Sequence, residues 1–191
     1  MLSLQALYTQ ILARDLVLKT PSEGMASLPK VGKIHVHFTS KALLADPTHL
    51  LIPATALTVL TGQRPKVIRA RCSVATFKLR KGDPLGCHLT LRGQKMWAFL
   101  TQWSMLFLPL DPRQSSLALA SDHPHLFLGL KDVLSFPTLK MGIDFFETLE
   151  GAQISLHMAN HSSMEPRVGE AFWSGLGLPV HPPQAYGQSK P

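Results

Sequence analysis

The sequence predicts an α+β fold in which one β-sheet has helices packed on one face. Segments with alternating apolar and polar residues are mixed with segments of helical periodicity, and the two do not alternate strictly. The chain has 191 residues, 45% of them hydrophobic, which is enough for a substantial core. We therefore expect a single domain over residues 1–178 and a proline-rich tail over residues 179–191.

The first third of the chain predicts a helix, a strand and a second helix. Leucine spacing predicts a helix over residues 3–19, and alternation predicts a strand over residues 31–38. The pair Asp46–Pro47 should start a helix that extends to Leu60 and ends near a glycine. Pro53 lies inside that helix, so we expect it to kink or split there.

The rest of the chain predicts five more strand-like stretches and two helices. An antiparallel pair of strands should flank a turn-rich tip at residues 77–84, and residues 109–124 should be irregular. The predicted strands are 66–74, 85–91 and 152–158, the shorter extended pieces are 125–130 and 134–136, and the helices are 93–108 and 165–176.

Positive charge is concentrated between residues 61 and 95. This segment holds nine of the nineteen Lys and Arg residues and one acid, Asp83, whereas ten basic and eleven acidic residues lie elsewhere. The formal net charge of +7 is therefore a local feature, which indicates a polyanionic partner. RNA is the favoured partner because Lys and Arg that neutralise phosphates release counterions.

The pleat of the two predicted central strands suggests how the basic residues are displayed. Arg69 and Arg71 should share one face of their strand, with Lys66 alternating the other way. On the returning strand, His88, Thr90 and Arg92 should share a face, with leucines opposite. We expect an RNA-facing side over an apolar helical side, although an ordinary solvated hairpin with a basic bias remains the alternative.

The tip between these strands combines an aromatic side chain with cations. Such a tip suits stacking on a base or ribose while the cations meet phosphates. Its residues are Phe77, Lys78, Leu79, Arg80 and Lys81.

Catalytic and metal-binding signals are weak. None of the common nucleophile, phosphate-loop, dinucleotide or metalloprotease motifs occurs, so we expect no catalytic residues and no cofactor. The pair His35 and His37 would suit zinc only with further ligands, so a polar strand face is favoured and no metal is expected. Two reduced thiols are favoured over a bridge between Cys72 and Cys87, and no apolar run is long enough to span a membrane.

One long segment resembles a known family. Residues 61–100, TGQRPKVIRARCSVATFKLRKGDPLGCHLTLRGQKMWAFL, are similar to the central signature of the bacterial and organellar ribosomal large-subunit protein five. The resemblance extends to LPKVGKIHV at 28–36, LGLKDVLSFP at 128–137 and EPRVGEAFWSGLGLP at 165–179. It covers nearly the whole chain.

The resemblance implies a largely antiparallel sheet of about five strands, helices on one face and a protruding basic hairpin arm. It implies a structural, non-catalytic role in translation, in the central protuberance of the large ribosomal subunit. The implied partners are 5S or 5S-like rRNA, large-subunit rRNA, P-site tRNA at the arm, small-subunit head protein thirteen and neighbouring large-subunit proteins, with no membrane.

Several residues match positions that the family uses for RNA contact. Gln63, Phe77 and Thr90 match directly, whereas His37 stands where the family usually has Asn. The predicted rRNA-binding residues are Lys33, His37, Gln63, Arg64, Lys66, Arg69, Arg71, His88, Thr90, Arg92 and Lys95. The predicted tRNA-facing arm consists of Phe77, Lys78, Leu79, Arg80 and Lys81.

The family's usual glycine-rich loop is replaced by DPRQSSLALASDHPHLF at residues 111–127. This drift, with few charges and many leucines, resembles a mitochondrial member, so we expect a mitochondrial ribosome, with the chloroplast or the bacterial cytoplasm as alternatives. A free RNA-binding regulator or chaperone of similar fold is the rival function. An RNA-processing enzyme would need clustered carboxylates or a metal set, which the sequence does not suggest.

Overall fold

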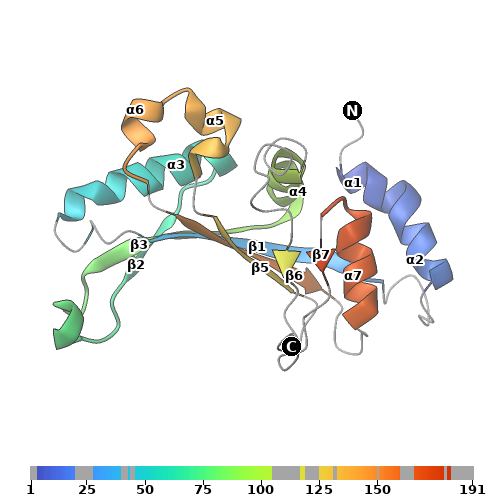
Figure 1. Cartoon of the computed structure of the whole chain (residues 1–191), viewed down its shortest axis with the longest axis horizontal. Helices are drawn as coiled ribbons and strands as arrows, with labels where there is room; N and C mark the ends of the chain where they lie inside the picture. Colours follow the sequence, from blue (N-terminus) through green and yellow to red (C-terminus); the bar gives the residue numbers. More distant parts are fainter. Residues whose placement is uncertain are drawn as a thin grey trace, which may run out of the picture.

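The computed structural model describes residues 4–19, 28–39, 43, 46–104, 117–118, 125–130, 133–149, 151–159, 166–178 and 180–181. Its centre is a five-stranded sheet of order β2-β3-β1-β6-β5, in which all neighbouring strands are antiparallel (Figure 1). This confirms the predicted α+β class. The strands are β1 (Lys30–Thr39), β2 (Lys66–Arg69), β3 (Pro84–Leu91), β5 (Leu126–Leu130) and β6 (Ala152–Ala159).

The helices lie in two groups. In Figure 1, α3 (Leu51–Thr61), α4 (Gly93–Gln102), α5 (Pro137–Lys140) and α6 (Ile143–Phe146) lie over one face of the sheet. At one end of the sheet lie α7 (Pro166–Gly175) and the N-terminal helix, which runs through α1 (Leu4–Leu7), the π-helical turn Tyr8–Leu12 and α2 (Ala13–Lys19). A two-residue strand, β4 (Leu117–Ala118), pairs in parallel with β7 (Val180–His181).

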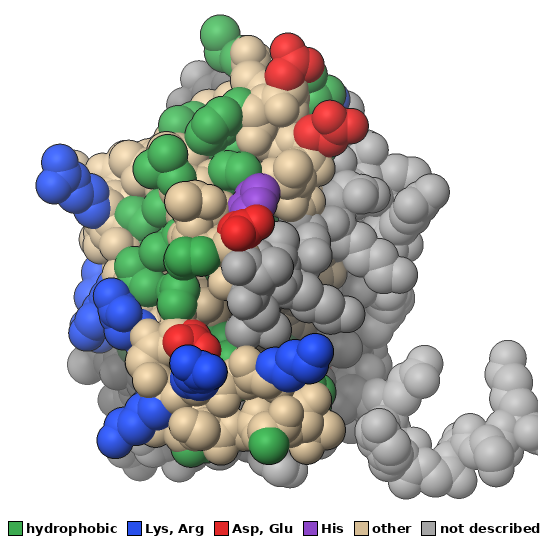
Figure 2. Space-filling view, turned by 90° about the vertical axis from the view of Figure 1, so that its left-hand side faces the viewer, with side chains coloured by type: hydrophobic (Ala, Val, Ile, Leu, Met, Phe, Trp, Pro, Cys, Tyr) green, Lys and Arg blue, Asp and Glu red, His purple; other side chains and the backbone are tan. Residues whose placement is uncertain are grey.

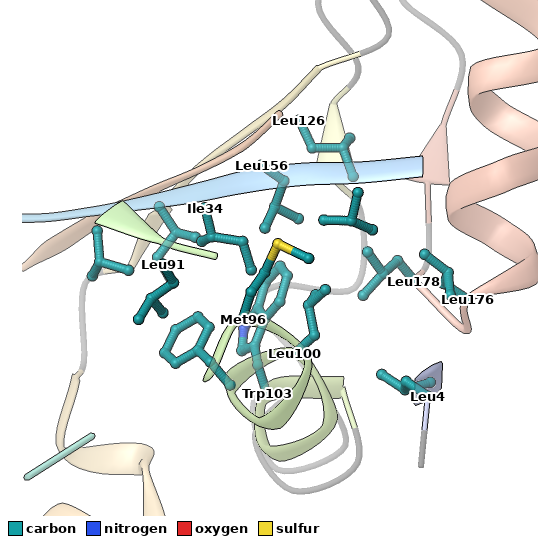
Figure 3. Packing of buried hydrophobic residues seen from close by; sticks show 14 of the residues in the cluster. Leu4, Ile34, Leu91, Met96, Leu100, Trp103, Leu126, Leu156, Leu176 and Leu178 are labelled. Atoms are coloured by element: carbon teal, nitrogen blue, oxygen red, sulfur yellow. The ribbon is translucent and has the colours of Figure 1, made fainter. Parts of the chain in front are cut away.

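The hydrophobic core lies between the sheet and the helices. Alternate strand residues such as Ile34, Leu91 and Leu156 point into it and are almost completely buried. They meet Met96 and Leu100 of α4 and Trp103, which directly follows this helix (Figure 3). In the described part of the chain, no helix has both the length and the apolar character of a membrane span.

Tyr8 joins the N-terminal helix to the rest of the core. Its ring stacks on Trp97 and meets the edge of Phe172, with centroids 5.9 and 6.0 Å away. Its buried hydroxyl donates a hydrogen bond to the carbonyl of Pro29 at 3.0 Å, and burial raises the pKa of Tyr8. The predicted first helix is confirmed over residues 4–19. Tyr8 attaches it both to the segment before β1, through Pro29, and to the helices that carry Trp97 and Phe172.

The predicted second helix is split, as Pro53 suggested. A 3₁₀ turn, Pro47–Leu50, leads into α3, and Pro53 is the third residue of α3. The first residues of an α-helix need no intrahelical partner for their N–H groups, so proline is tolerated there. Gly62 ends α3 with φ of 62°, a left-handed conformation that glycine adopts without strain.

The strand predicted over residues 66–74 is wrong in its length, because β2 ends at Arg69. The register shifts between Ile68 and Arg69, where Arg69 lies opposite Pro84. Proline has no N–H to donate, so the regular ladder ends at this point. The prediction for β3 is confirmed within one residue.

The extended piece predicted at residues 134–136 is also wrong. The chain forms a 3₁₀ turn at Val133–Ser135 and then α5, with Pro137 in its first turn. Val133, Phe136 and Leu139 are all buried, and their spacing of three places them on one side of a helical path. Residues 105–108 of the helix predicted over 93–108, and residues 179 and 182–191 of the tail, lie outside the described residues, and the single-domain assignment stays a prediction.

Candidate nucleic-acid interface

The sheet face away from α3–α6 is polar, and we call it the open face. Cross-strand partners in an antiparallel sheet point to the same side, so the register identifies its members. Apart from the buried Ser155, the other side chains of this set are half-buried or exposed. None of the five strands contains Asp or Glu. The open face comprises Lys33, His35, His37, Lys66, Ile68, His88, Thr90, His125, Phe127, Gln153, Ser155 and His157.

Five histidines form a continuous row of rings across this face, which we call the imidazole row. His88 on β3 stacks on His37 of β1, with centroids 5.6 Å apart and an interplanar angle of 15°. His37 lies 6.0 Å from His35, and His35 meets His157 of β6 edge-on at 4.9 Å. His157 in turn lies 4.9 Å from His125, next to β5. The row thus links four neighbouring strands.

A short hydrogen-bonded chain connects the row to the end of α3. The Thr90 hydroxyl and Nδ1 of His35 share a hydrogen bond of 2.8 Å, whose direction depends on the histidine tautomer. The Gln63 side-chain amide donates to the Thr90 carbonyl at 3.5 Å. Lys95 Nζ donates to the Gly62 carbonyl at 2.8 Å. The structure therefore brings together Gln63 and Thr90, two residues predicted to contact RNA.

Burial and nearby positive charge lower the pKa of two rings of the row, His35 and His37. Partial burial lowers the pKa of His35, and the nearby positive charge of Lys33, the other histidines and Arg92 lowers it further. Partial burial also lowers the pKa of His37, together with the neighbouring His88. At neutral pH these two rings are neutral, and each ring then carries one donor and one acceptor nitrogen.

The predicted display of the basic residues is wrong for Lys66. Expected to alternate away from the RNA-facing side, Lys66 lies directly across from His88 and shares the open face with it. Arg69 lies past the register shift and donates from Nη1 to the Gly82 carbonyl at 3.1 Å. Arg71 lies beyond the end of β2, so it does not extend a basic stripe on that strand. Arg64, Arg92 and Lys95 are exposed near the open face's β2–β3 side, at the ends of the adjoining elements.

Residues 70–83 form the β2–β3 loop, which extends beyond the sheet in Figure 1. Val74 and Leu79 pair through two backbone hydrogen bonds of 3.0 and 3.1 Å, and the 3₁₀ turn Ala75–Phe77 closes the tip. The side chains of Ser73 and Asp83 accept backbone hydrogen bonds from Lys81 and Arg80 at 3.0 and 2.8 Å. The loop is therefore held in one shape by its own contacts.

The β2–β3 loop presents cations and one large apolar ring to the outside. Phe77 is 69% exposed, and Arg71, Lys78, Arg80 and Lys81 are exposed as well, whereas Leu79 is partly covered. Figure 2 shows most Lys and Arg side chains of this side gathered in its lower part, around the loop, and hydrophobic side chains over much of its upper part. An exposed aromatic side chain among cations suits stacking on RNA.

The structure describes no alternative chemistry at this face. Within the described residues, no three His, Cys, Asp or Glu side chains converge in a way that could hold a metal ion. Cys72 is exposed, Cys87 is buried, and both are free thiols, the state that the sequence analysis favoured. Burial raises the pKa of the Cys87 thiol, which keeps it protonated and unreactive at neutral pH.

The sequence analysis assigned His37 and His88 to the site but not His125 or His157. His35 was noted only as a partner of His37. The spacing of His35 and His37 on one strand was the available signal, because period-two residues share a face. The remaining members come from strands that lie up to 122 positions away along the chain, and only the register brings them together.

Comparison with known proteins gives consistent relatives over nearly the full length. The chain is 32% identical to large ribosomal subunit protein uL5m of Reclinomonas americana, over 91% of this chain and 95% of that protein. It is 32% identical to large ribosomal subunit protein uL5 of Ureaplasma urealyticum, over 92% and 94% of the two chains. For uL5 of Buchnera aphidicola the identity is 28%, over 94% and 98%.

No family model matches the chain. The pairwise similarities nevertheless cover the sheet, the helices and the β2–β3 loop together, since the alignments span more than nine-tenths of the sequence. The chain therefore belongs to the uL5 family, whose members are structural, non-catalytic proteins of the large ribosomal subunit.

Proposed function

We propose that this protein binds ribosomal RNA through the open face and the cations around it. The observation that carries the proposal is the chemistry of the five strands, which hold lysines, an arginine and the imidazole row but no carboxylate. A phosphate backbone approaching this face meets Lys33 and Lys66 without a repelling side chain on the strands. The linked polar groups of Gln63, Thr90 and His35 then supply hydrogen bonds that depend on RNA shape.

The expected RNA partners are 5S or 5S-like rRNA and the adjoining large-subunit rRNA, at the central protuberance. The predicted contact residues Lys33, His37, Lys66, His88 and Thr90 lie on one face, which supports a single continuous RNA surface. Ultraviolet crosslinking followed by RNA sequencing tests the identity of the RNA. We expect crosslinks between peptides of β1 or β3 and these rRNAs.

A charge-reversal experiment tests the face itself. Lys33→Glu combined with Lys66→Glu should reduce incorporation into large subunits, because both charges lie on the open face. Lys140→Glu is the control, since Lys140 is exposed at the end of α5 on the helical side. Sedimentation of tagged protein in high-salt gradients gives the readout. Normal incorporation of the double variant would exclude this surface, and a wild-type chain that stays off the subunits would favour the free regulator or chaperone.

We further propose that the β2–β3 loop contacts P-site tRNA, and that another surface contacts small-subunit head protein thirteen. Exposed Phe77, Arg80 and Lys81 support the tRNA contact, because their backbone is held in place independently of these side chains. The triple alanine variant of these residues should assemble normally and bind P-site tRNA more weakly in a filter-binding assay. Failed assembly would instead identify the loop as an rRNA anchor.

The proposed location is the mitochondrial ribosome. The relatives include the mitochondrial uL5m and several bacterial uL5 proteins, so a bacterial ribosome is the alternative. Organelle fractionation of cells expressing the tagged chain separates the two locations. Comigration with mitochondrial large subunits is the expected result.

A further inference from the structure

The imidazole row has a chemical character that differs from the cations around it. Among the described residues, the charged groups that face it are Lys33 from β1, Lys66 from β2 and Arg92 directly after β3, and these three are positive. A proton added to the row meets further histidines from β3, β1, β6 and the start of β5. Since like charges repel and no strand carboxylate offsets them, the free surface resists becoming cationic.

The Nδ1 atoms of two further rings of the row lie on its inner side. Nδ1 of His125 accepts a hydrogen bond from the backbone N–H of Met158 at 3.2 Å, so this nitrogen carries no proton. Nδ1 of His88 is buried and has no hydrogen-bond partner among the described residues. In both rings Nδ1 is thus turned toward the protein rather than toward the open face.

A neutral imidazole matches different parts of RNA than a cation does. It offers a donor, an acceptor and an aromatic face, which suit ribose 2′-hydroxyls, base edges and base planes. Phosphate oxygens only accept hydrogen bonds and favour cationic donors. Such cations flank the row, so the open face can contact phosphates and ribose or base groups at neighbouring positions.

We propose that the imidazole row contacts ribose hydroxyls and bases of RNA as uncharged groups, while Lys33, Lys66 and Arg92 hold the neighbouring phosphates. This inference rests on the proposed RNA-binding function and adds a division of labour to it. The row supplies the preference for RNA over other polyanions, and the flanking cations supply most of the salt-dependent affinity.

The test compares three probes with matched variants. The probes are a bacterial 5S rRNA transcript, a single-stranded DNA of the same sequence and inorganic polyphosphate, and dissociation constants are measured by fluorescence anisotropy or competition. The row variant is His37→Ala with His88→Ala, which removes the stacked pair. Lys66→Ala is the charge variant, and His49→Ala is the control because His49 lies on the turn before α3, outside the open face.

The row variant should weaken RNA binding roughly tenfold, as loss of base stacking does elsewhere. It should weaken DNA binding less, because DNA offers base planes but no 2′-hydroxyls, and it should leave polyphosphate binding and the slope of log K against log salt unchanged. Lys66→Ala should reduce that slope by about 0.9, the value for one phosphate contact. His49→Ala should change neither quantity, and wild-type RNA affinity should be constant between about pH 7 and pH 8.5.

A smaller salt slope, an equal loss on polyphosphate or an RNA affinity that falls as pH rises would overturn the proposal, since each means cationic imidazoles on phosphates. Unchanged RNA affinity would mean that the row is only solvated surface. A wild-type chain that binds no RNA would overturn the proposed function as well. Thermal unfolding checks that the variants fold. If His37→Ala with His88→Ala does not fold, His37→Gln with His88→Gln is measured in its place. That pair keeps a donor and an acceptor but no ring, and it should lose RNA affinity while retaining the salt slope.

Discussion

The two faces of β1 differ in burial and in chemistry, and adjacent residues belong to opposite faces. Phe38 points to the helices and is 2% exposed, whereas His37 points to the open face and stacks on His88. The pleat alone separates them, because successive side chains of a strand point to opposite sides. The comparison teaches that a buried core face and a polar open face are specified by alternate positions of the same strand, so each face can be changed separately.

The largest expected effect is on the core face. Phe38→Ala removes a fully buried ring and should lower the free energy of unfolding by about 3–5 kcal/mol. His37→Ala, one residue away, should change it by less than about 1 kcal/mol, because the ring is only half-buried. Urea titration followed by circular dichroism measures both. Similar losses for the two variants would show that the faces are not energetically distinct.

Glycine at position 86 tests how closely β3 approaches β1. A Cβ atom there would lie 2.1 Å from the carbonyl oxygen of Phe38, a backbone atom that cannot rotate away. Gly86→Ala should therefore destabilise the protein by about 1–3 kcal/mol, as overpacking does. Gly129→Ala on β5 is the control, since nothing lies within 4 Å of its added Cβ. A Gly86 variant as stable as the Gly129 variant would mean that the strands separate without cost.

The Tyr8→Phe variant tests whether the stability of the core also depends on a polar contact. The change keeps the ring contacts with Trp97 and Phe172 and removes the hydrogen bond to the Pro29 carbonyl. The expected loss in unfolding free energy is about 0.5–1.5 kcal/mol. Thermal and urea unfolding measure it. No loss would indicate that water replaces the hydroxyl at Pro29.

The smallest expected effect is the pH dependence contributed by the open face. The pKa values of His35 and His37 are lowered in the folded protein, so the unfolded chain binds more protons as the pH falls below about 6.5. These groups make their full contribution to the free energy of unfolding above that pH. The contribution declines as the pH falls through the lowered folded-state pKa values. Thermal melts between about pH 7.5 and pH 5 should show a smaller decline for His35→Gln with His37→Gln than for wild type. An equal decline would assign the pH dependence to other groups.

The sequence predicted the fold from local signals. Alternation identified β1, β3, β5 and β6 within a few residues, and the Pro53 and Gly62 signals located α3. These features depend on residues that are close together along the chain. The helical path through Val133, Phe136 and Leu139 was missed because an apolar run of that length suits a strand or a helix equally.

The site could be predicted only in part, because it depends on pairing between strands. The charge pattern indicated RNA, yet only the register shows that Lys66, expected to point away, lies across from His88. The imidazole row joins residues from four strands, and composition gives no sign of which histidines meet. Registers follow from tertiary packing, so this part of the interface required the structure.

The hydrophobic core is formed between the sheet and the helices by side chains of this chain. Such a scaffold can acquire its shape before it joins a ribosome, and it then docks as a preformed body. Docking in that order spares the encounter the entropy loss that a disordered ribosomal extension incurs when it folds on its target. The sheet face covered by helices therefore belongs to the folding of the protein, and the open face is left for a later contact with the subunit.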